Sequence, residues 1–270
     1  MNYQVLVLDL DGTLTNSKKE ITEPTRKALI EIQQAGKIVV LASGRPINGV
    51  RPLAEQLDLA RYGNYMLSFN GARITKCSSN ETIYNKTLPS EVIRPVYELV
   101  KSYPGLDIVS YTDEEIISGV EPNEYTLLES RIDGMPVRQA VDFPSELKDP
   151  VNKMLITGNP DSIAELEERM KSIYHGFINI YRSEPYFLEV MPQNIDKAHS
   201  LHRLLTTIGL SAEQMICCGD GYNDVSMIEY AGLGVAMENA QLIVKEKADF
   251  ITHSNDEDGV LHVINLFMRS

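Results

Sequence analysis

The chain has 270 residues, of which 43% are hydrophobic and 23% are charged, so it can bury a large core. Lys and Arg number 25 and Asp and Glu number 38, which gives a formal net charge of −13. This acidic balance disfavours a general nucleic-acid binder, which needs a basic surface, but it permits small anionic substrates.

Three features of the sequence bear on where the protein resides. No apolar stretch reaches the roughly 18 residues of a membrane span. The first residues lack the basic segment and cleavage site of a signal peptide. The three cysteines are too few, and odd in number, for a disulfide framework. We therefore expect a cytoplasmic protein that does not bind membranes.

The first part of the chain alternates strand and helix patterns. Apolar runs at residues 3–10, 37–43 and 65–69 predict three strands. Between them, a helix is expected from Thr22 as N-cap to Gly36 as its stop, and a second over residues 47–58. This order predicts a parallel sheet wound with helices on both faces, in which ligands lie at the carboxyl ends of the strands.

The strand–helix alternation stops in the middle of the chain. Residues 72–77 and 82–87 predict a hairpin, residues 89–103 a helix, 105–120 another hairpin and 121–132 a helix. A connection with three prolines follows, and then a strand over 151–158, a helix over 162–174, and strands over 177–183 and 186–192. We expect this block to form an α+β module with its own antiparallel sheet.

After residue 194 the strand–helix alternation resumes. Helices are expected over 195–209, 223–232, 239–248 and the C-terminus, with strands over 215–220, 233–237 and 249–252. The predicted fold class is therefore α/β, a doubly wound, parallel, Rossmann-like core sheet with an inserted α+β domain. The core is assigned to residues 1–84 and 192–270, and the insertion to residues 85–191.

Two carboxylates follow the first strand in the run VLVLDLDGTLT, which extends from Val5 to Thr15. Asp9 and Asp11 lie at the end of a strand that looks buried, where unpaired charge costs several kcal/mol or more. The residues alone leave two explanations open. Either the strand end is solvated, or a cation and a reaction that needs it are located there.

Four short segments together resemble a known family. DLDGT after the first strand, SGR after the second, a lysine at position 197 and GDGYND after a later strand resemble the four motifs of the haloacid dehalogenase superfamily. NGA at Asn70–Ala72, PYFLEVMP and MIEYAGLGVAMENA make the chain most similar to the Cof-type sugar phosphatases. The resemblance spans nearly the whole chain and implies hydrolysis of small phosphorylated sugars, with the insertion acting as a cap that contributes to substrate choice.

This resemblance and carboxylate chemistry together suggest a role for each acidic residue. Asp9 is the expected nucleophile, because a carboxylate can attack phosphorus and form an aspartyl phosphate. Asp11 is expected to protonate the leaving oxygen and later to take a proton from water. Mg2+ is the expected cofactor, held by Asp9, the backbone carbonyl of Asp11 and Asp220. Asp224 is expected to orient metal-bound waters or Lys197 without binding the metal directly.

A second group of residues is expected to hold the phosphate and the rest of the substrate. Lys197 is expected to neutralise the transferring phosphate and to hold Asp9. The further expected contacts are Leu10, Ser43, Gly44, Arg45, Asn70 and Asn223. The alternative to a substrate contact for Arg45 is an ion pair at the surface. The alternative for Lys197 is a solvated charge, which is usual for a lysine at a helix start.

Two rival functions stay open at this point. A sugar phosphomutase would share the aspartyl phosphate but return the phosphoryl group to a sugar. A non-catalytic sugar-phosphate-binding protein would lack one of the key groups, whereas Asp9, Asp11, Lys197 and Asp220 are all present. The expected partners are small phosphorylated metabolites, and the chain is expected to be a monomer or a weak homodimer.

Overall fold

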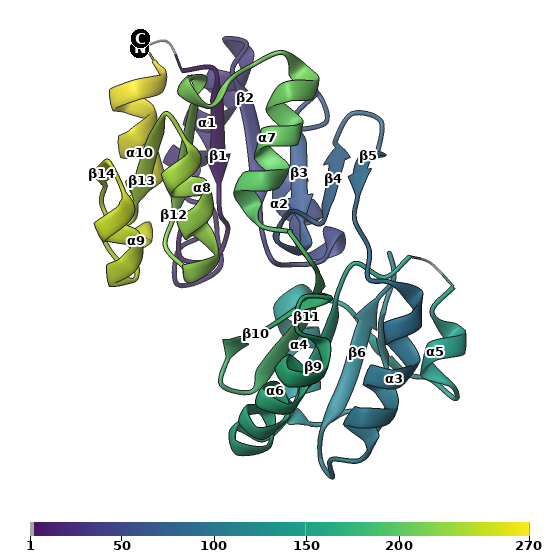
Figure 1. Cartoon of the computed structure of the whole chain (residues 1–270). Helices are drawn as coiled ribbons and strands as arrows, with labels where there is room; N and C mark the ends of the chain where they lie inside the picture. The colour runs from purple at the N-terminus through teal and green to yellow at the C-terminus, as the bar shows by residue number, and fades with distance from the viewer. Residues whose placement is uncertain (1–2, 149, 270) are drawn as a thin grey trace. The chain divides into compact units, whose positions relative to one another are not determined.

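The computed structural model describes residues 3–148 and 150–269, and these form two compact units (Figure 1). The first unit comprises the chain up to Tyr84 and from Asp196 onward, and the second is Asn85–Ile195. The second junction lies four residues later than the sequence suggested. Strand β11 (Phe187–Pro192) pairs within the second unit, and the chain continues there to Ile195.

An eight-stranded sheet forms the centre of the first unit, in the order β14-β13-β12-β1-β2-β3-β4-β5. All pairs from β14 to β3 are parallel, and β4 pairs antiparallel with β3. This confirms the predicted α/β fold class. The strands are β1 (Val5–Leu8), β2 (Ile38–Ala42), β3 (Tyr65–Ser68), β4 (Arg73–Lys76), β5 (Glu81–Asn85), β12 (Met215–Gly219), β13 (Leu233–Ala236) and β14 (Phe250–Ile251).

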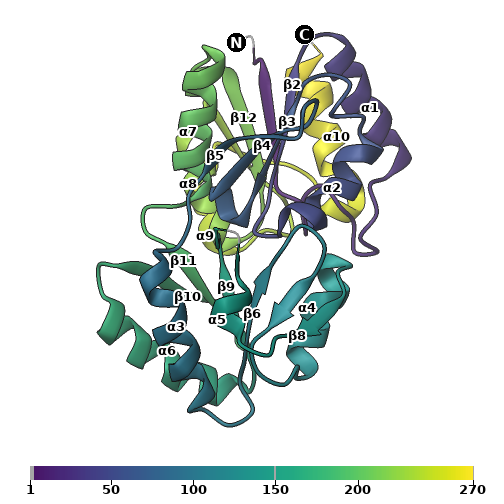
Figure 2. The same cartoon turned by 90° about the vertical axis from the view of Figure 1, so that its right-hand side faces the viewer.

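Helices cover both faces of this sheet, as Figure 2 shows, with α7 and α8 on one face and α1, α2 and α10 on the other. Helix α1 begins as expected, since the Thr22 side chain caps it by accepting from the Thr25 N–H. The chain turns away after it at Gly36, which has a φ of +87°. The helices are α1 (Glu23–Gln34), α2 (Ile47–Gln56), α7 (Lys197–Ile208), α8 (Val225–Tyr230), α9 (Leu242–Lys247) and α10 (Gly259–Val263).

Strand β1 lies between β12 and β2, and all four of its residues are fully buried. This position explains the apolar run that precedes the acidic pair, because a central parallel strand is covered on both faces. The chain leaves β1, β2, β3 and β12 at the same edge of the sheet, since these strands are parallel. Polar residues that follow those strands are thus brought together.

The second unit has a six-stranded sheet in the order β10-β11-β9-β6-β7-β8. The predicted antiparallel pairing is found except at β8, which the sequence analysis missed and which pairs parallel with β7. β8 has only three residues within the proline-containing connection, too few for a periodic signal. The elements are β6 (Asp107–Tyr111), β7 (Ile116–Ser118), β8 (Val137–Gln139), β9 (Met154–Thr157), β10 (Ile178–Glu184), β11, α3 (Ser90–Lys101), α4 (Glu124–Asp133), α5 (Phe143–Glu146) and α6 (Pro160–Tyr174).

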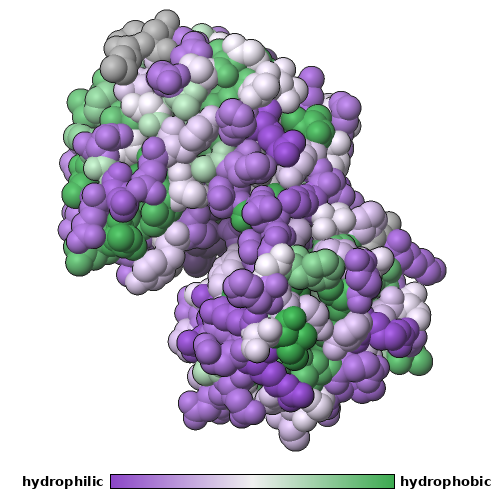
Figure 3. Space-filling view, in the orientation of Figure 1, coloured by the Kyte–Doolittle hydropathy of each residue, from purple (hydrophilic) through white to green (hydrophobic). Residues whose placement is uncertain are grey.

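The surface is mainly hydrophilic on the face that Figure 3 shows, with separate hydrophobic areas such as the one over α9. Leu242 in that helix is 72% exposed. Single exposed apolar residues of this kind are normal on globular proteins. Among the described residues, no helix combines the length and the apolar character that crossing a membrane requires.

Candidate active site

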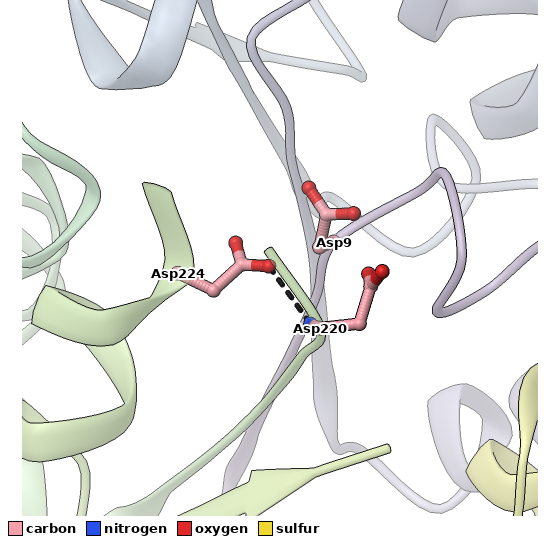
Figure 4. Close-up of side chains that lie close together, drawn as sticks. All are labelled: Asp9, Asp220 and Asp224. Carbon is pink, nitrogen blue, oxygen red and sulfur yellow. Dashed lines mark hydrogen bonds between the residues drawn. The ribbon is translucent and has the colours of Figure 1, made fainter. Parts of the chain in front are cut away.

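Two separate segments bring three carboxylates together at the carboxyl edge of the core sheet (Figure 4). Asp9 follows β1, Asp220 follows the neighbouring β12, and Asp224 lies four residues further on. One carboxylate oxygen from each lies within 4.8 Å of the others. Asp9 is only 7% exposed and Asp224 is fully buried. The strand end is therefore not simply a solvated terminus.

Lys197 supplies the positive charge inside this cluster. Its side chain is fully buried at the start of α7, and its Nζ lies 2.5 Å from Asp9 Oδ1 and 2.6 Å from Asp224 Oδ1. A lysine at a helix start is normally solvated, but the resemblance to a known family led us to expect that Lys197 holds Asp9. Lys197 bridges two carboxylates that are 188 and 27 residues away along the chain.

One lysine does not balance three carboxylates. Burial raises the pKa of Asp9 well above its usual value, and the charges of Asp224 and Asp220 raise it further against the opposing effect of Lys197. Burial also raises the pKa of Asp220 to about 6. Both carboxylates would be ionised more readily beside an added cation. The cluster of oxygen ligands with surplus negative charge therefore suits a divalent metal ion such as Mg2+.

Asp224 differs from the other two carboxylates because both of its oxygens already accept hydrogen bonds. Oδ1 accepts from Lys197, and Oδ2 accepts from the backbone N–H groups of Asp220 and Gly221, each at 2.9 Å. Figure 4 shows the bond from the Asp220 amide as a dashed line. Asp224 thereby holds Lys197 and the Asp220 backbone in place.

Asp11 is held by two cations at the edge of the site. Arg45 donates from Nε to Oδ2 at 2.8 Å and from Nη2 to Oδ1 at 2.7 Å, and Lys19 donates to Oδ1 at 2.7 Å. Partial burial alone would raise the pKa of Asp11, but Arg45 and then Lys19 outweigh it and lower that pKa. Arg45 thus forms an ion pair, the alternative considered for it, although its side chain is only 15% exposed.

The other expected substrate contacts surround this centre. Ser43 is 4% exposed, and its hydroxyl accepts from the Arg45 N–H at 3.2 Å. Asn70 has a left-handed backbone with a φ of +53°, and its Oδ1 accepts from Asn223 Nδ2 at 3.1 Å. A Cβ added to Gly44 would come within 3.1 Å of the Asn70 side chain, so that glycine permits a close approach.

Leu10 is available only through its backbone N–H. The side chain is fully buried, and the carbonyl accepts from Thr13 N, Thr15 N and Thr15 Oγ1 at 3.4, 2.9 and 3.0 Å. These bonds fold residues 10–15 into a tight turn. The Leu10 side chain itself therefore cannot contact a substrate in this arrangement.

Two further residues of the DLDGT segment, Thr13 and Gly12, also shape the site, and of these Thr13 was not among the expected site residues. Thr13 Oγ1 donates to Asp220 Oδ1 at 2.8 Å and so links the ends of β1 and β12. Gly12 has a φ of +79°, and a Cβ there would overlap the Asp220 carboxylate. The sequence indicated these residues only by placing them inside the DLDGT motif. Their partner Asp220 lies 207 residues after Thr13, so the contact could not be read from the sequence.

Comparisons with known proteins identify the family of this chain. The family model for haloacid dehalogenase-like hydrolases matches residues 6–264. The chain is 31% identical to the 5-amino-6-(5-phospho-D-ribitylamino)uracil phosphatase YcsE of Bacillus subtilis, over 98% of this chain and 95% of that protein.

Two solved structures are also similar. A haloacid dehalogenase-like hydrolase from Bacteroides thetaiotaomicron is 46% identical, with a TM-score of 0.94 over 98% of this chain and 99% of that one. The subclass IIB sugar phosphatase BT4131 is 26% identical, with a TM-score of 0.81 over 97% of this chain and 98% of that one.

Proposed function

Because this chain belongs to the haloacid dehalogenase-like hydrolases and is similar to members named phosphatases, we propose that it is a Mg2+-dependent phosphatase of sugar phosphates and similar small phosphomonoesters. The observation that carries this proposal is the buried cluster of Asp9, Asp220 and Asp224 around Lys197. Buried, incompletely balanced charge lowers stability, and clusters of this kind are found preferentially at binding and catalytic sites.

Asp9 is the proposed nucleophile. One of its carboxylate oxygens attacks phosphorus, the new O–P bond forms, and the bond from phosphorus to the substrate's ester oxygen breaks. Water then attacks phosphorus, which breaks the acyl phosphate and releases inorganic phosphate and the Asp9 carboxylate. The contact of 2.5 Å with Lys197 supports this role, because the ammonium favours the ionised form of the carboxylate and orients it.

Asp11 is the proposed acid and base. It gives a proton to the departing alkoxide and takes one from the attacking water, so its protonation state is restored after each turnover. Arg45 and Lys19 hold it as an anion in the structure, and a bound phosphate would compete for both cations. Loss of either contact raises the pKa of Asp11 towards the range of a proton donor.

Asp9, the backbone carbonyl of Asp11 and Asp220 would hold Mg2+, and Asp224 would orient Lys197 beside them. When bound, Mg2+ supplies positive charge that offsets the repulsion between the Asp9 carboxylate and the phosphate. Ser43, Gly44, Asn223 and the N–H of Leu10 are the proposed donors to the phosphate oxygens. Asn70 is proposed to orient Asn223, which it contacts at 3.1 Å.

The inserted unit, which has its own hydrophobic core, is proposed to select the substrate's leaving group. Its polar segment Tyr181–Tyr186 was a candidate for this role. Part of that segment is engaged internally, since Arg182 pairs with Glu167 at 2.6 Å and Tyr186 stacks on Tyr125. Substitutions in this segment should change the ranking of sugar phosphates and not the rate with an aryl phosphate, and a uniform change would oppose the proposal.

The decisive test is phosphate release from a panel of sugar phosphates, an aryl phosphate and 5-amino-6-(5-phospho-D-ribitylamino)uracil, with Mg2+ and with EDTA. We expect release with Mg2+ and none with EDTA. Conversion of one sugar phosphate to its isomer without release would instead identify a phosphomutase. Binding with neither release nor conversion would identify a non-catalytic binding protein.

A further inference from the structure

We propose that Asn239 is a positioning residue for this reaction, which holds the turn bearing Asp11 through a hydrogen bond to the carbonyl of Gly12. The inference rests on the proposed phosphatase function and on the role of Asp11 as acid and base. Asn239 is located after β13, outside the four motif segments, and it belongs to none of the groups assigned to the substrate or the metal.

The contacts of Asn239 fix the orientation of its side-chain amide. Its Nδ2 donates to the Gly12 carbonyl at 2.8 Å, and its Oδ1 accepts from the backbone N–H of Asn255 at 3.0 Å. Asn255 follows β14, and its own Nδ2 donates to the Thr15 carbonyl at 2.9 Å. Since a backbone N–H can only donate, the amide oxygen must face Asn255 and the NH2 group must face Gly12.

The turn from Asp11 to Thr15 needs such external support. Gly12 lies in the left-handed region, where glycine provides conformational freedom but no side chain to pack. The side chain of Asp11 is 36% exposed, so packing does not hold it. Its position is set by the ion pairs with Arg45 and Lys19 and by the backbone, and that backbone is fastened at Gly12 and Thr15 by the two asparagines.

The loop that carries Asn239 is itself constrained. Ala240 N donates to the Met237 carbonyl at 3.0 Å, and Glu238 N donates to the His253 carbonyl at 3.3 Å. The outer strands β13 and β14 thus support the turn after the central strand β1. Because small displacements of a catalytic group cost up to about a hundredfold in rate, loss of this support would weaken proton transfer by Asp11.

The experiment compares Asn239→Ala and Asn239→Asp with the wild type on a sugar phosphate and an aryl phosphate, with Mg2+. We expect Asn239→Ala to lower kcat for the sugar phosphate by about tenfold. The loss for the aryl phosphate should be smaller, because its leaving group needs little protonation. Asn239→Asp keeps the shape but faces the Gly12 carbonyl with an acceptor, so its loss should be at least as large.

Asp256→Ala is the matched control. Asp256 lies next to Asn255 and accepts from the Ser17 N–H at 2.8 Å, which fastens the same loop beyond Thr15. The ratio of kcat for the sugar phosphate to kcat for the aryl phosphate should stay at the wild-type level in this variant. If Asn239→Ala does not fold, Asn239→Asp supplies the same ratio, since it can still accept from the Asn255 N–H.

Equal losses on the two substrates in the Asn239 variants, or wild-type rates in Asn239→Asp, would overturn the inference. The same is true if Asp256→Ala changes the ratio as much as Asn239→Ala does, because any loosening of the loop would then suffice. Failure of the wild type to hydrolyse either substrate would instead refute the proposed function, so the two failures are distinguishable.

Discussion

Replacement of Lys197 by methionine tests the central electrostatic argument, because it keeps an apolar stem and removes the ammonium. In the wild type, the fully buried Lys197 Nζ lies 2.5 Å from Asp9 and 2.6 Å from Asp224. The substitution removes this partner from both carboxylates. Breaking a buried ion pair typically costs about 3–5 kcal/mol. We expect a decrease of that size in the free energy of unfolding at pH 8 without metal.

The loss should depend on pH in a defined direction. The pKa of Asp9 is already raised in the folded state, so the folded state binds a proton more readily than the unfolded chain. Such a group contributes stability at low pH that is lost as pH rises through its folded-state pKa. Removing Lys197 raises that pKa further, so the deficit of Lys197→Met should be small at pH 5 and large at pH 8.

Urea unfolding followed by circular dichroism in EDTA, at pH 5 and pH 8, measures this difference. Lys247→Met is the control, because Lys247 pairs with Glu229 at 2.7 Å on the surface and its loss should change stability little at either pH. Added Mg2+ should restore part of the stability of Lys197→Met, since it binds only the folded cluster. Equal stability of Lys197→Met and wild type at pH 8 would refute the reasoning.

Three further predictions follow from the same cluster. Asp9→Asn should abolish phosphate release while leaving the metal-free protein at least as stable as wild type at pH 8, because a neutral amide replaces a buried carboxylate; near-normal turnover would remove Asp9 as the nucleophile. Asp11→Asn should slow sugar phosphates more than aryl phosphates in steady-state assays, and equal losses would contradict its acid role. Mg2+ affinity, measured by calorimetry, should weaken as pH falls through about 6, where Asp220 takes up a proton, and a flat profile from pH 5 to 8 would count against Asp220 as a ligand.

Much of the architecture could be predicted because it is recorded in local patterns. The apolar run before Asp9 predicted a buried strand, and Thr22 and Gly36 marked the ends of helix α1. The three-residue strand β8 escaped prediction because so short a segment has no periodicity and its parallel pairing with β7 depends on the folded unit. Shortness alone does not prevent prediction, since the two-residue strand β14 lies inside the predicted strand at 249–252, whereas β8 lies in a connection that contains three prolines.

The sequence by itself determined the α/β class and which residue types could perform phosphoryl chemistry, because burial periodicity and motif spacing are local properties. The resemblance to a known family led us to expect that Lys197 holds Asp9. The tertiary structure alone decided that Lys197 is fully buried, that Arg45 holds Asp11, and that Asn239 holds Gly12. These partners are separated by 34 to 227 residues, so no local pattern connects them. They meet because the carboxyl ends of parallel strands lie at one edge of the sheet. At that edge, buried charges and hydrogen-bond donors pair with residues from distant parts of the chain.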